Sequence, residues 1–378
     1  MTSSPDIHGV CPPELAAVED AFAANFTDAP EGLNEQGARF SVRIGGETVI
    51  DLWGGSADAA GTVPFGERTL TPVFSTGKAV MALLIATCVE RGLLDYEATV
   101  ASYWPAFGQA GKADITVGQM MSHQAGLPGF DTPEDPSIWF DREAALARLC
   151  AQAPMWEPGT ASGYSPIVIG YLAGELFRFV DGRTMGTALR EDFPGLDLWI
   201  GLPEAEHDRV AQMRKPAKAT NLGEIDAIKK AAFLDKGSSP GGRGSAEWRM
   251  IEIPSANLHG TAPDLARMAG ILADGGTFEG RTVLSPETLA AATRERIHGP
   301  DRVLPYEMSW AAGFTRNAGL NIFGTNPDAV GHCGWGGSCV FADPARALSA
   351  AYVMTRQSPH LIGDPRAQRL IGALYDGL

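Results

Sequence analysis

Apolar side chains recur every three to four residues in several stretches of the chain, the spacing of helices that bury one face. The stretch after Gly77 is apolar almost throughout, which predicts a long buried helix that ends near Gly92. Thr116 and Thr261 each precede such a stretch and are suitable N-cap residues. The patterns together predict helices at residues 13–27, 77–92, 141–152, 166–180, 261–274 and 365–376.

A second set of segments is typical of strands bounded by turn residues. Residues 38–53 hold two such runs around Gly45-Gly46-Glu47, which predicts a hairpin with a glycine turn. Residues 338–342 and 347–354 predict two further strands, separated by Asp343-Pro344. The predicted elements follow the order helix, strands, a long helical middle, then strands and a helix. This order indicates one mixed domain whose sheet comes from both chain ends, with a helical part inserted.

Two segments lack a clear period. Residues 201–256 are rich in Gly, Pro, Lys and Glu. Compact domains seldom keep long loops without a role, so we interpret this segment as loops beside a binding cleft in preference to a disordered insertion. Residues 130–140 also predict a loop.

Composition narrows the class of protein. Of the 378 residues, 44% are hydrophobic and 20% are charged, which is enough apolar material for a large core. The net charge of −15 and the isoelectric point near 4.9 argue against nucleic acid or an anionic membrane as a partner. The seven histidines show no metal-ligand spacing, so no metal site is expected.

Cysteine usage and the N-terminus bear on the compartment. The five cysteines include no Cys-x-x-Cys pair, which is typical of free thiols in a reducing environment. The N-terminus has neither the basic nor the apolar region of a signal peptide, and no apolar run reaches membrane-spanning length. We therefore expect a cytoplasmic protein.

Ser75 and Lys78 carry the strongest chemical signal. They lie three residues apart at the start of a predicted helix, so their side chains share one face. A serine hydroxyl needs a neighbouring base to act as a nucleophile, and a lysine in a dry site can lose its proton and become that base. An N-cap serine beside a solvated lysine is the structural alternative for this pair alone.

Further motifs decide between these interpretations, and they occur in an order and at separations typical of one family. The segments are Phe-Ser75-Thr-Gly-Lys78, Ile115-Thr-Val-Gly-Gln-Met-Met-Ser-His123-Gln-Ala-Gly-Leu-Pro128, Trp156-Glu-Pro-Gly159-Thr-Ala-Ser-Gly-Tyr164 and Gly331-His332-Cys333-Gly334. From about residue 13 to the C-terminus, the chain resembles the serine β-lactamase and penicillin-binding-protein-like superfamily, and within it is most similar to the family VIII carboxylesterases.

The resemblance implies an α+β fold. An antiparallel sheet flanked by helices would be formed by residues 1–75 and 257–378, and a mostly helical part with cleft-lining loops by residues 76–256. It also implies that the Tyr164 phenol relays the serine proton and later protonates the leaving group, which requires a nearby cation such as Lys78 because a phenol ordinarily has a pKa near 10.

The sequence departs from the family pattern at Pro166. Penicillin-recognising enzymes usually carry an asparagine there, whose amide helps to hold the lactam side chain. Proline offers no side-chain hydrogen bond. The departure counts against lactam recognition but leaves the nucleophile and the base in place.

The family's third motif, usually Lys-Thr-Gly, aligns with His332-Cys333-Gly334, or in another register with Trp335-Gly336-Gly337. Small residues on a strand edge let backbone N–H groups approach a substrate oxygen. We predict an oxyanion hole formed by the N–H groups of Ser75 and Trp335. His332 would polarise the site or orient the substrate, with a structural histidine as the alternative.

Further candidates are less specific. Trp139, Phe140, Trp156 and Trp335 suggest an aromatic cleft for short acyl chains or aryl esters, although core packing explains each of them as well. Asn257 precedes a predicted helix and is a candidate for the cleft wall or for a turn.

Two motifs are set aside. Gly237-Ser238-Ser239-Pro240-Gly241 matches the Gly-x-Ser-x-Gly elbow of α/β-hydrolases, but its flanks do not predict the strand and helix that the elbow requires. His123 is of a catalytic type, but in the matching family motif this residue is usually structural.

These features together predict a serine hydrolase that cleaves short-chain acyl or aryl carboxylic esters. Its substrate would be a small-molecule ester, attacked by Ser75 with Lys78 and Tyr164 as general base and acid, and no metal or organic cofactor is expected. One alternative is a β-lactamase, D-amino-acid peptidase or linear-amide hydrolase with the same nucleophile. The other is a non-catalytic relative that kept the fold.

Overall fold

A nine-stranded antiparallel sheet forms the centre of the structure, a computed structural model that describes residues 6–378. The strand order is β1-β3-β2-β14-β13-β12-β11-β10-β9, so the two chain ends meet where β2 pairs with β14. The strands of this sheet are β1 (Ile7–Val10), β2 (Gly37–Ile44), β3 (Glu47–Gly55), β9 (Ile297–Pro300), β10 (Glu307–Trp310), β11 (Thr315–Arg316), β12 (Val330–Cys333), β13 (Cys339–Asp343) and β14 (Leu348–Met354).

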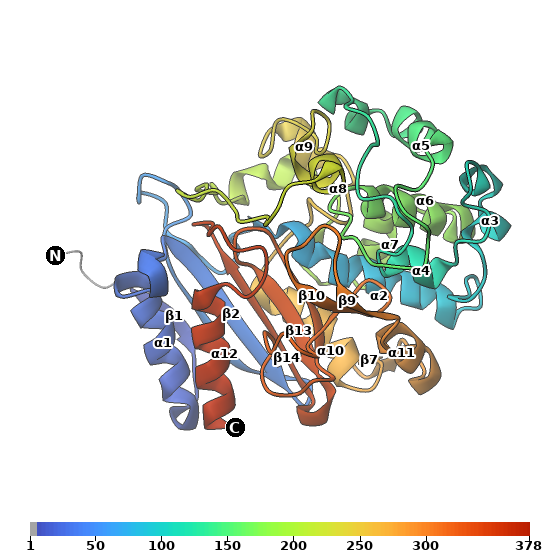
Figure 1. Cartoon of the computed structure of the whole chain (residues 1–378). Helices are drawn as coiled ribbons and strands as arrows, with labels where there is room; N and C mark the ends of the chain where they lie inside the picture. The colour runs from blue at the N-terminus through green and yellow to red at the C-terminus, as the bar shows by residue number, and fades with distance from the viewer. Residues whose placement is uncertain (1–5) are drawn as a thin grey trace.

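Helices cover both faces of the sheet and fill the region beside it (Figure 1). The α-helices are α1 (Ala16–Thr27), α2 (Gly77–Glu90), α3 (Val100–Tyr103), α4 (Val117–Met121), α5 (Arg142–Ala151), α6 (Val168–Asp181), α7 (Met185–Asp192), α8 (Ala227–Lys229), α9 (Ala246–Met250), α10 (Ala262–Ala273), α11 (Pro286–Thr293) and α12 (Pro365–Gly377). There are two further small sheets. One has the strand order β4 (Thr71–Pro72), β6 (His259–Gly260), β5 (Leu198–Trp199), and the other pairs β7 (Thr277–Phe278) with β8 (Arg281–Thr282). Short 3₁₀ or π turns cover residues 13–15, 30–32, 74–76, 105–108, 136–140, 204–209, 230–234 and 344–346.

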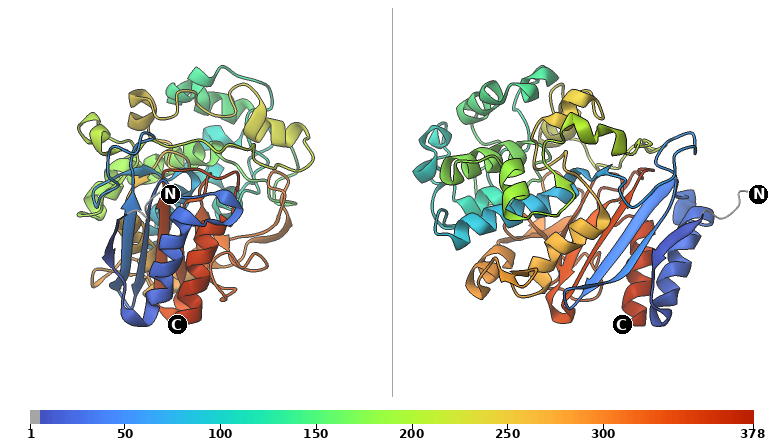
Figure 2. Two further views of the ribbon diagram at one scale, coloured as in Figure 1. Left: turned by 90° about the vertical axis from the view of Figure 1, so that its left-hand side faces the viewer. Right: turned by 180° about the vertical axis from the view of Figure 1, so that it is seen from behind.

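The period-two pattern of β14 explains why both faces of the sheet are buried. Ala350, Tyr352 and Met354 face a core shared with α1 and α12. Ala351 and Val353 face the opposite core, which α2 and α10 complete. Figure 2 shows the paired α1 and α12 on one side of the sheet and the helical region beyond its other side.

The fold class predicted from the sequence is confirmed, and so are the helices predicted with it. Residues 13–15 form a 3₁₀ turn that leads into α1, and α6 begins at Val168, two residues after its predicted start. Thr116 and Thr261 both cap helices through their hydroxyls, and Thr116 makes a full capping box with Gln119. The glycine turn between β2 and β3 is present, with φ of +58° at Gly45 and +84° at Gly46.

Several short elements escape the sequence pattern. β1 and β9 to β12 have only two to four residues each, too few for an alternation to be recognised. The predicted loop at 130–140 contains a 3₁₀ turn. Residues 201–256 hold only short helical pieces joined by irregular chain, and this segment runs over the cavity described below. Within residues 6–378, no helix has the length and apolarity to cross a bilayer.

Candidate active site

Ser75 lies in a single 3₁₀ turn, Phe74–Thr76, directly before α2. Phe74 adopts a left-handed backbone with φ of +50°, which is strained for a bulky residue. Thr76 fixes the turn because its hydroxyl lies 2.9 Å from the Ser338 hydroxyl, which in turn donates to the Val73 carbonyl. The half-buried Ser75 side chain thus stands at the start of a buried helix and faces a cavity.

Gly77 allows this arrangement. A Cβ atom at this position would lie 2.8 Å from Leu258 Cβ and 3.1 Å from the Pro254 carbonyl oxygen. Only glycine lets the first turn of α2 approach the 254–258 segment so closely. The glycine of the Ser-Thr-Gly-Lys sequence is therefore explained by packing.

Lys78 is fully buried, and its ammonium nitrogen has three polar neighbours. Nζ lies 3.1 Å from Ser75 Oγ, 2.9 Å from the Pro166 carbonyl and 2.8 Å from the Ser255 carbonyl. Burial lowers the pKa of Lys78 well below its ordinary value of 10.5. The two carbonyls can only accept, so in the neutral amine they use both N–H groups and the lone pair is left for Ser75.

Tyr164 contacts the same serine from a segment that lies 89 positions further along the chain. Its hydroxyl donates to Ser75 Oγ over 2.6 Å, and Lys78 Nζ lies 4.8 Å from the centre of its ring. Burial raises the pKa of Tyr164 above 10, so at neutral pH this residue is a phenol that donates a proton in its hydrogen bond. Ser75, Lys78 and Tyr164 therefore meet as the sequence predicts.

Asp301 holds the Tyr164 segment, and sequence reasoning missed it. This buried carboxylate accepts from the Tyr164, Val303 and Leu304 N–H groups, each at 2.9 Å. It also accepts from the Ser162 hydroxyl at 2.8 Å and from Trp310 Nε1 at 3.2 Å. Trp310 stacks on the Tyr164 ring, with centroids 5.9 Å apart. Val303 and Leu304 are local partners, but Tyr164 and Ser162 lie 137 and 139 positions away, so the sequence does not reveal that Asp301 holds this segment.

The third motif lies where β12 ends, and the His332 ring is 6.1 Å from the Tyr164 ring between centroids. His332 is buried and its Nδ1 lies 2.7 Å from the Cys333 carbonyl, so the proton is on Nδ1 and Nε2 is an acceptor that has no partner among residues 6–378. Burial lowers the pKa of His332 to about 3, with Lys78 as a second cause, so the ring is neutral. A Cβ atom on Gly334 would lie 2.2 Å from the Val73 carbonyl oxygen, which shows how closely this hairpin approaches the Ser75 turn.

The N–H groups of Ser75 and Trp335 are both available. Within residues 6–378, neither donates to another atom of the chain. Both residues line the same cavity, and Phe74 and Trp335 pack edge to face with ring centroids 5.6 Å apart. The described structure is therefore compatible with either register of the third motif, because His332 and Trp335 both face the cavity.

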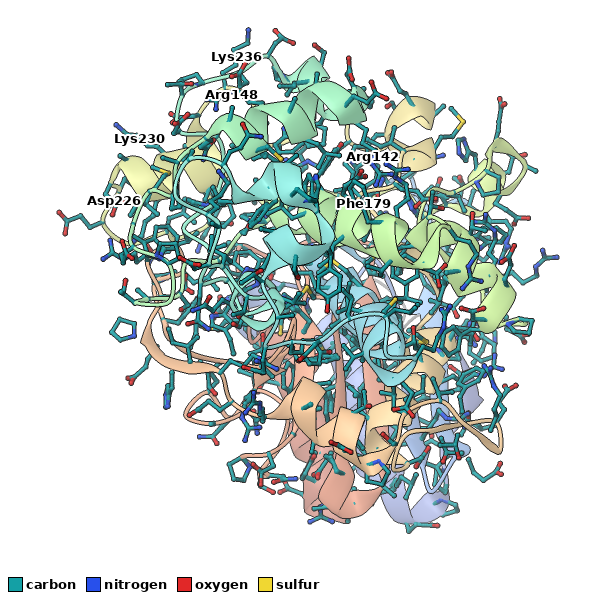
Figure 3. The ribbon with its side chains drawn as sticks, turned by 90° about the vertical axis from the view of Figure 1, so that its right-hand side faces the viewer. Arg142, Arg148, Phe179, Asp226, Lys230 and Lys236 are labelled. Atoms are coloured by element: carbon teal, nitrogen blue, oxygen red, sulfur yellow. The ribbon has the colours of Figure 1, made fainter. Side chains whose placement is uncertain are left out.

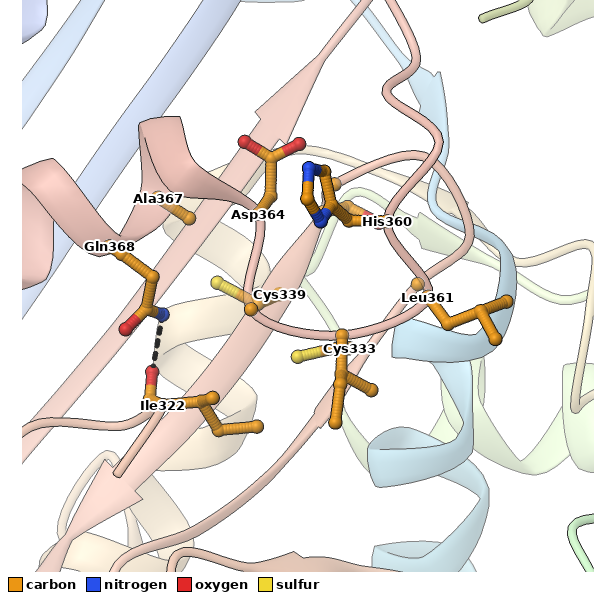
Figure 4. Close-up of a pocket in the computed structure, with 13 residues that line it drawn as sticks. Ile322, Cys333, Cys339, His360, Leu361, Asp364, Ala367 and Gln368 are labelled. Carbon is orange, nitrogen blue, oxygen red and sulfur yellow. Dashed lines mark hydrogen bonds between the residues drawn. The ribbon is translucent and has the colours of Figure 1, made fainter. Parts of the chain in front are cut away.

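A buried ion group supports this hairpin from behind. Arg366 pairs with Glu35 at 3.0 Å and with Asp364 at 2.8 Å, and its guanidinium also reaches the Gly336 carbonyl at 3.4 Å. Figure 4 shows Asp364 and His360 beside the cross-strand pair Cys333 and Cys339 in this region. The group fixes the loop that carries Trp335.

The cavity in front of Ser75 has a volume of about 340 Å³. Its wall is mostly apolar, and much of it comes from residues 219–248. The apolar lining residues include Phe74, Ile167, Leu222, Ala232, Phe233, Leu234, Trp248, Leu304, Trp310, Leu361 and Ile362. Sequence reasoning placed loops of the 201–256 segment beside a cleft and named Trp335, which also lines this cavity, but it identified none of the side chains just listed.

Four of the predicted cleft residues do not line this cavity. Trp139 is core: its indole donates to the Gly237 carbonyl at 2.7 Å, between Phe130 and Tyr171. Trp156 packs against Gly163 and donates to the Ala161 carbonyl, so it supports the turn before Tyr164.

The other two also lie outside the cavity wall. Phe140 ends the 136–140 turn, half-buried and outside the cavity wall. Asn257 is fully buried and closes a turn, since its side chain bonds the backbone of Trp248, Ile251 and Ile253. The structure thus places Trp139 and Trp156 in packing positions, Asn257 in a turn and Phe140 outside the cavity wall.

His123 and Ser239, which were not assigned to the site, differ in their position relative to the cavity. His123 is buried beneath Tyr164 and accepts from the Ser165 N–H at 3.2 Å, so it is a packing residue outside the cavity. Ser239 lines the cavity, but it lies in irregular chain without the strand and helix of a nucleophile elbow. Within residues 6–378, no lysine or histidine is hydrogen-bonded to it.

Fold and site together define the class of protein. The Beta-lactamase family profile matches residues 22–373, so the chain belongs to that family and is a serine hydrolase of the β-lactamase-like type. The resemblance inferred from the four motifs is thereby confirmed.

Three similar proteins indicate which members of this family the chain resembles. The chain is 36% identical over 366 residues to Esterase/beta-lactamase LipL of Mycobacterium tuberculosis, with 93% of this chain and 83% of LipL covered. It is similar to a penicillin-binding protein homologue from Caulobacter crescentus, with 57% identity, a TM-score of 0.96 and 99% and 100% of the two chains covered. It is also similar to a family VIII carboxylesterase, with 39% identity, a TM-score of 0.91 and 99% and 100% covered.

Proposed function

We propose that this protein is a carboxylesterase that hydrolyses short-chain acyl or aryl esters through an acyl-enzyme on Ser75. One observation carries the proposal: Ser75 Oγ lies 3.1 Å from the buried Lys78 amine and 2.6 Å from the Tyr164 hydroxyl, at the wall of an apolar cavity. A nucleophile, a base with a lowered pKa and a proton donor thus occupy one hydrogen-bonded group.

The first half of the reaction follows from this geometry. Neutral Lys78 accepts the Ser75 proton while Oγ attacks the ester carbonyl carbon. The N–H groups of Ser75 and Trp335 stabilise the resulting oxyanion. As the tetrahedral intermediate collapses, the proton passes from Lys78 through Tyr164 to the departing alcohol oxygen, which leaves Ser75 acylated.

The second half reuses the same groups. Water attacks the acyl carbon and gives one proton to the Tyr164 hydroxyl, which passes its own proton to the neutral Lys78 amine. Ser75 Oγ leaves and regains a proton, and the carboxylic acid is released. His332 lines the cavity, and we assign its buried Nε2, an acceptor without a partner in the described chain, to orient either this water or a polar group of the substrate.

The substrate class rests on the cavity. A volume of about 340 Å³ with aromatic and aliphatic walls suits a small apolar acyl or aryl group. Two of the relatives are named as esterases, LipL and the family VIII carboxylesterase. At position 166 the chain offers no side-chain amide, and the Pro166 carbonyl is already engaged by Lys78, which disfavours lactam recognition.

The test is hydrolysis of p-nitrophenyl acetate, butyrate and octanoate, beside the lactam nitrocefin, by the wild type and Ser75→Ala. We expect fast hydrolysis of the short esters by the wild type and a loss of at least a thousandfold in Ser75→Ala. Ser102→Ala, an exposed serine on α3, is the matched control. Equal activity in the wild type and Ser75→Ala would refute the assignment, and nitrocefin as the dominant substrate would make the protein a β-lactamase.

A further inference from the structure

The apolar cavity contains one charged side chain. Among the lining residues of the described chain, only Arg243 carries a charge at neutral pH, since Lys78 is not part of the wall and His332 is neutral. Ser238, Ser239 and Thr220 add hydroxyl groups to the lining. One part of the wall is therefore cationic and rich in hydrogen-bond donors.

Arg243 has no carboxylate partner. Within residues 6–378, no carboxylate oxygen lies within 4.0 Å of its guanidinium, whereas Arg148, Arg183 and Arg209 each pair with at least two acidic residues. Arg243 is an exposed residue, but partial desolvation at the cavity lowers its pKa and no acidic residue opposes this shift. In a chain with a net charge of −15, an arginine left unpaired at a binding cavity requires an explanation.

One contact positions the guanidinium, that with the Trp335 ring. It stacks on the Trp335 ring at 4.3 Å from the ring centre. Trp335 is itself held, because its indole N–H points to Thr220 Oγ1 and its carbonyl accepts from Gln357. Arg243 is thereby tied to the residue whose N–H we assign to the oxyanion hole.

The loop that carries Arg243 is anchored as well. Trp139 donates to the Gly237 carbonyl at 2.7 Å, the Glu134 N–H donates to the Lys236 carbonyl at 2.9 Å, and Lys236 pairs with Asp135 at 2.8 Å. Figure 3 shows Lys236 and Arg148 at the outer edge of the helical region, where this anchoring takes place. The loop ends where Ser245 caps α9.

We propose that Arg243 is an anion subsite of the cavity, and that the preferred substrates are esters that also bear a carboxylate group. A guanidinium stacked on an indole keeps N–H donors free at its edge, and these match the two oxygens of a carboxylate. The hydroxyls of Ser238 and Ser239 add donors to the same wall. The inference rests on the proposed esterase function and specifies its substrate class.

The carboxylate can belong to the acyl part or to the alcohol part of the ester. The acyl pair of probes is mono-p-nitrophenyl adipate and its neutral methyl ester. The alcohol pair is 4-butyryloxybenzoate and its methyl ester. The measured quantity is the ratio of kcat/KM for the anionic ester to kcat/KM for its neutral partner, after subtraction of the uncatalysed rate.

Arg243→Gln is the test variant, and Arg190→Gln is the matched control. Arg190 is an exposed arginine of α7 outside the cavity. Both variants lower the net charge by one unit, so a comparison of the two removes any effect of net charge on the binding of an anionic ester. We expect the ratio for one of the two pairs to fall about tenfold in Arg243→Gln, the size expected for the loss of one charge-assisted hydrogen bond. Arg243→Lys keeps the charge but not the fork of donors, so it should recover part of the ratio.

The outcomes separate the subsite from the function. A ratio in Arg243→Gln equal to that in Arg190→Gln for both pairs would overturn the anion subsite while the esterase function stands. A wild type that hydrolyses none of the four esters would overturn the esterase function, and the subsite with it. If Arg243→Gln fails to fold, Arg243→Ala beside Arg190→Ala replaces the pair of variants, and equal ratios in these two variants for both pairs of esters would overturn the subsite.

Discussion

Asp301→Asn tests whether a carboxylate outside the reacting group positions Tyr164. The substitution keeps the size and shape of the side chain but removes the charge and turns one acceptor into a donor. Oδ1 serves three N–H groups and Oδ2 serves Ser162 and Trp310. The asparagine oxygen therefore takes the Oδ1 position, and its NH₂ group faces Ser162 and Trp310.

The cost follows from these five hydrogen bonds. Ser162 can reverse its hydroxyl and accept, but the Trp310 indole can only donate, so one buried donor loses its partner at about 1–3 kcal/mol. The three bonds on the oxygen lose their charge assistance, which roughly halves each. Removal of a buried charge offsets part of the loss. We expect the free energy of unfolding to fall by about 3 kcal/mol.

Activity should fall through Tyr164. Its ring rests on Trp310, and its N–H is one of the groups that Asp301 binds, so the 2.6 Å contact with Ser75 depends on both. We expect kcat for p-nitrophenyl butyrate to fall by on the order of tenfold to a hundredfold, with a smaller change in KM, because a misplaced proton donor slows the chemical step.

The assay combines urea unfolding with steady-state kinetics at a temperature where both proteins are folded. Asp328→Asn is the matched control, since Asp328 is an exposed partner of Arg316, and its loss should change stability by less than about 1 kcal/mol. An Asp301→Asn protein with wild-type unfolding and wild-type kcat would refute the reasoning. A loss of stability with unchanged kcat would leave Asp301 as a structural residue only.

The remaining predictions concern the base and the third motif. Burial lowers the pKa of Lys78, and only the neutral amine can accept a proton. The kcat/KM for a neutral ester should therefore fall as the pH drops through this pKa and should reach its upper plateau at a pH well below 10. A tenfold rise per pH unit that continues to pH 10 would contradict this. Gly334→Ala should cost at least about 3 kcal/mol and most of the activity, because its Cβ would lie 2.2 Å from the Val73 carbonyl oxygen, whereas Gly372→Ala on α12 has open space and should stabilise by about 0.5–1 kcal/mol. Equal unfolding midpoints for the two glycine variants would show that the hairpin is free to move.

The sequence by itself determined the features whose cause is local. Ser75 and Lys78 share a helix face because three residues make nearly one turn, and Thr116 and Thr261 cap helices through bonds to residues three positions on. The hairpin of β2 and β3 follows from two glycines that adopt positive φ. These contacts need no knowledge of the rest of the fold.

Only the tertiary structure decided the surroundings of the nucleophile. Tyr164 reaches Ser75 across 89 positions, and Asp301 reaches Tyr164 across 137. Trp139 looked equally suited to a cleft or a core in the sequence, and Arg243 carried no signal at all. A side chain that lines a cavity and one that fills a core obey the same local pattern, so only the packing of distant segments separates them.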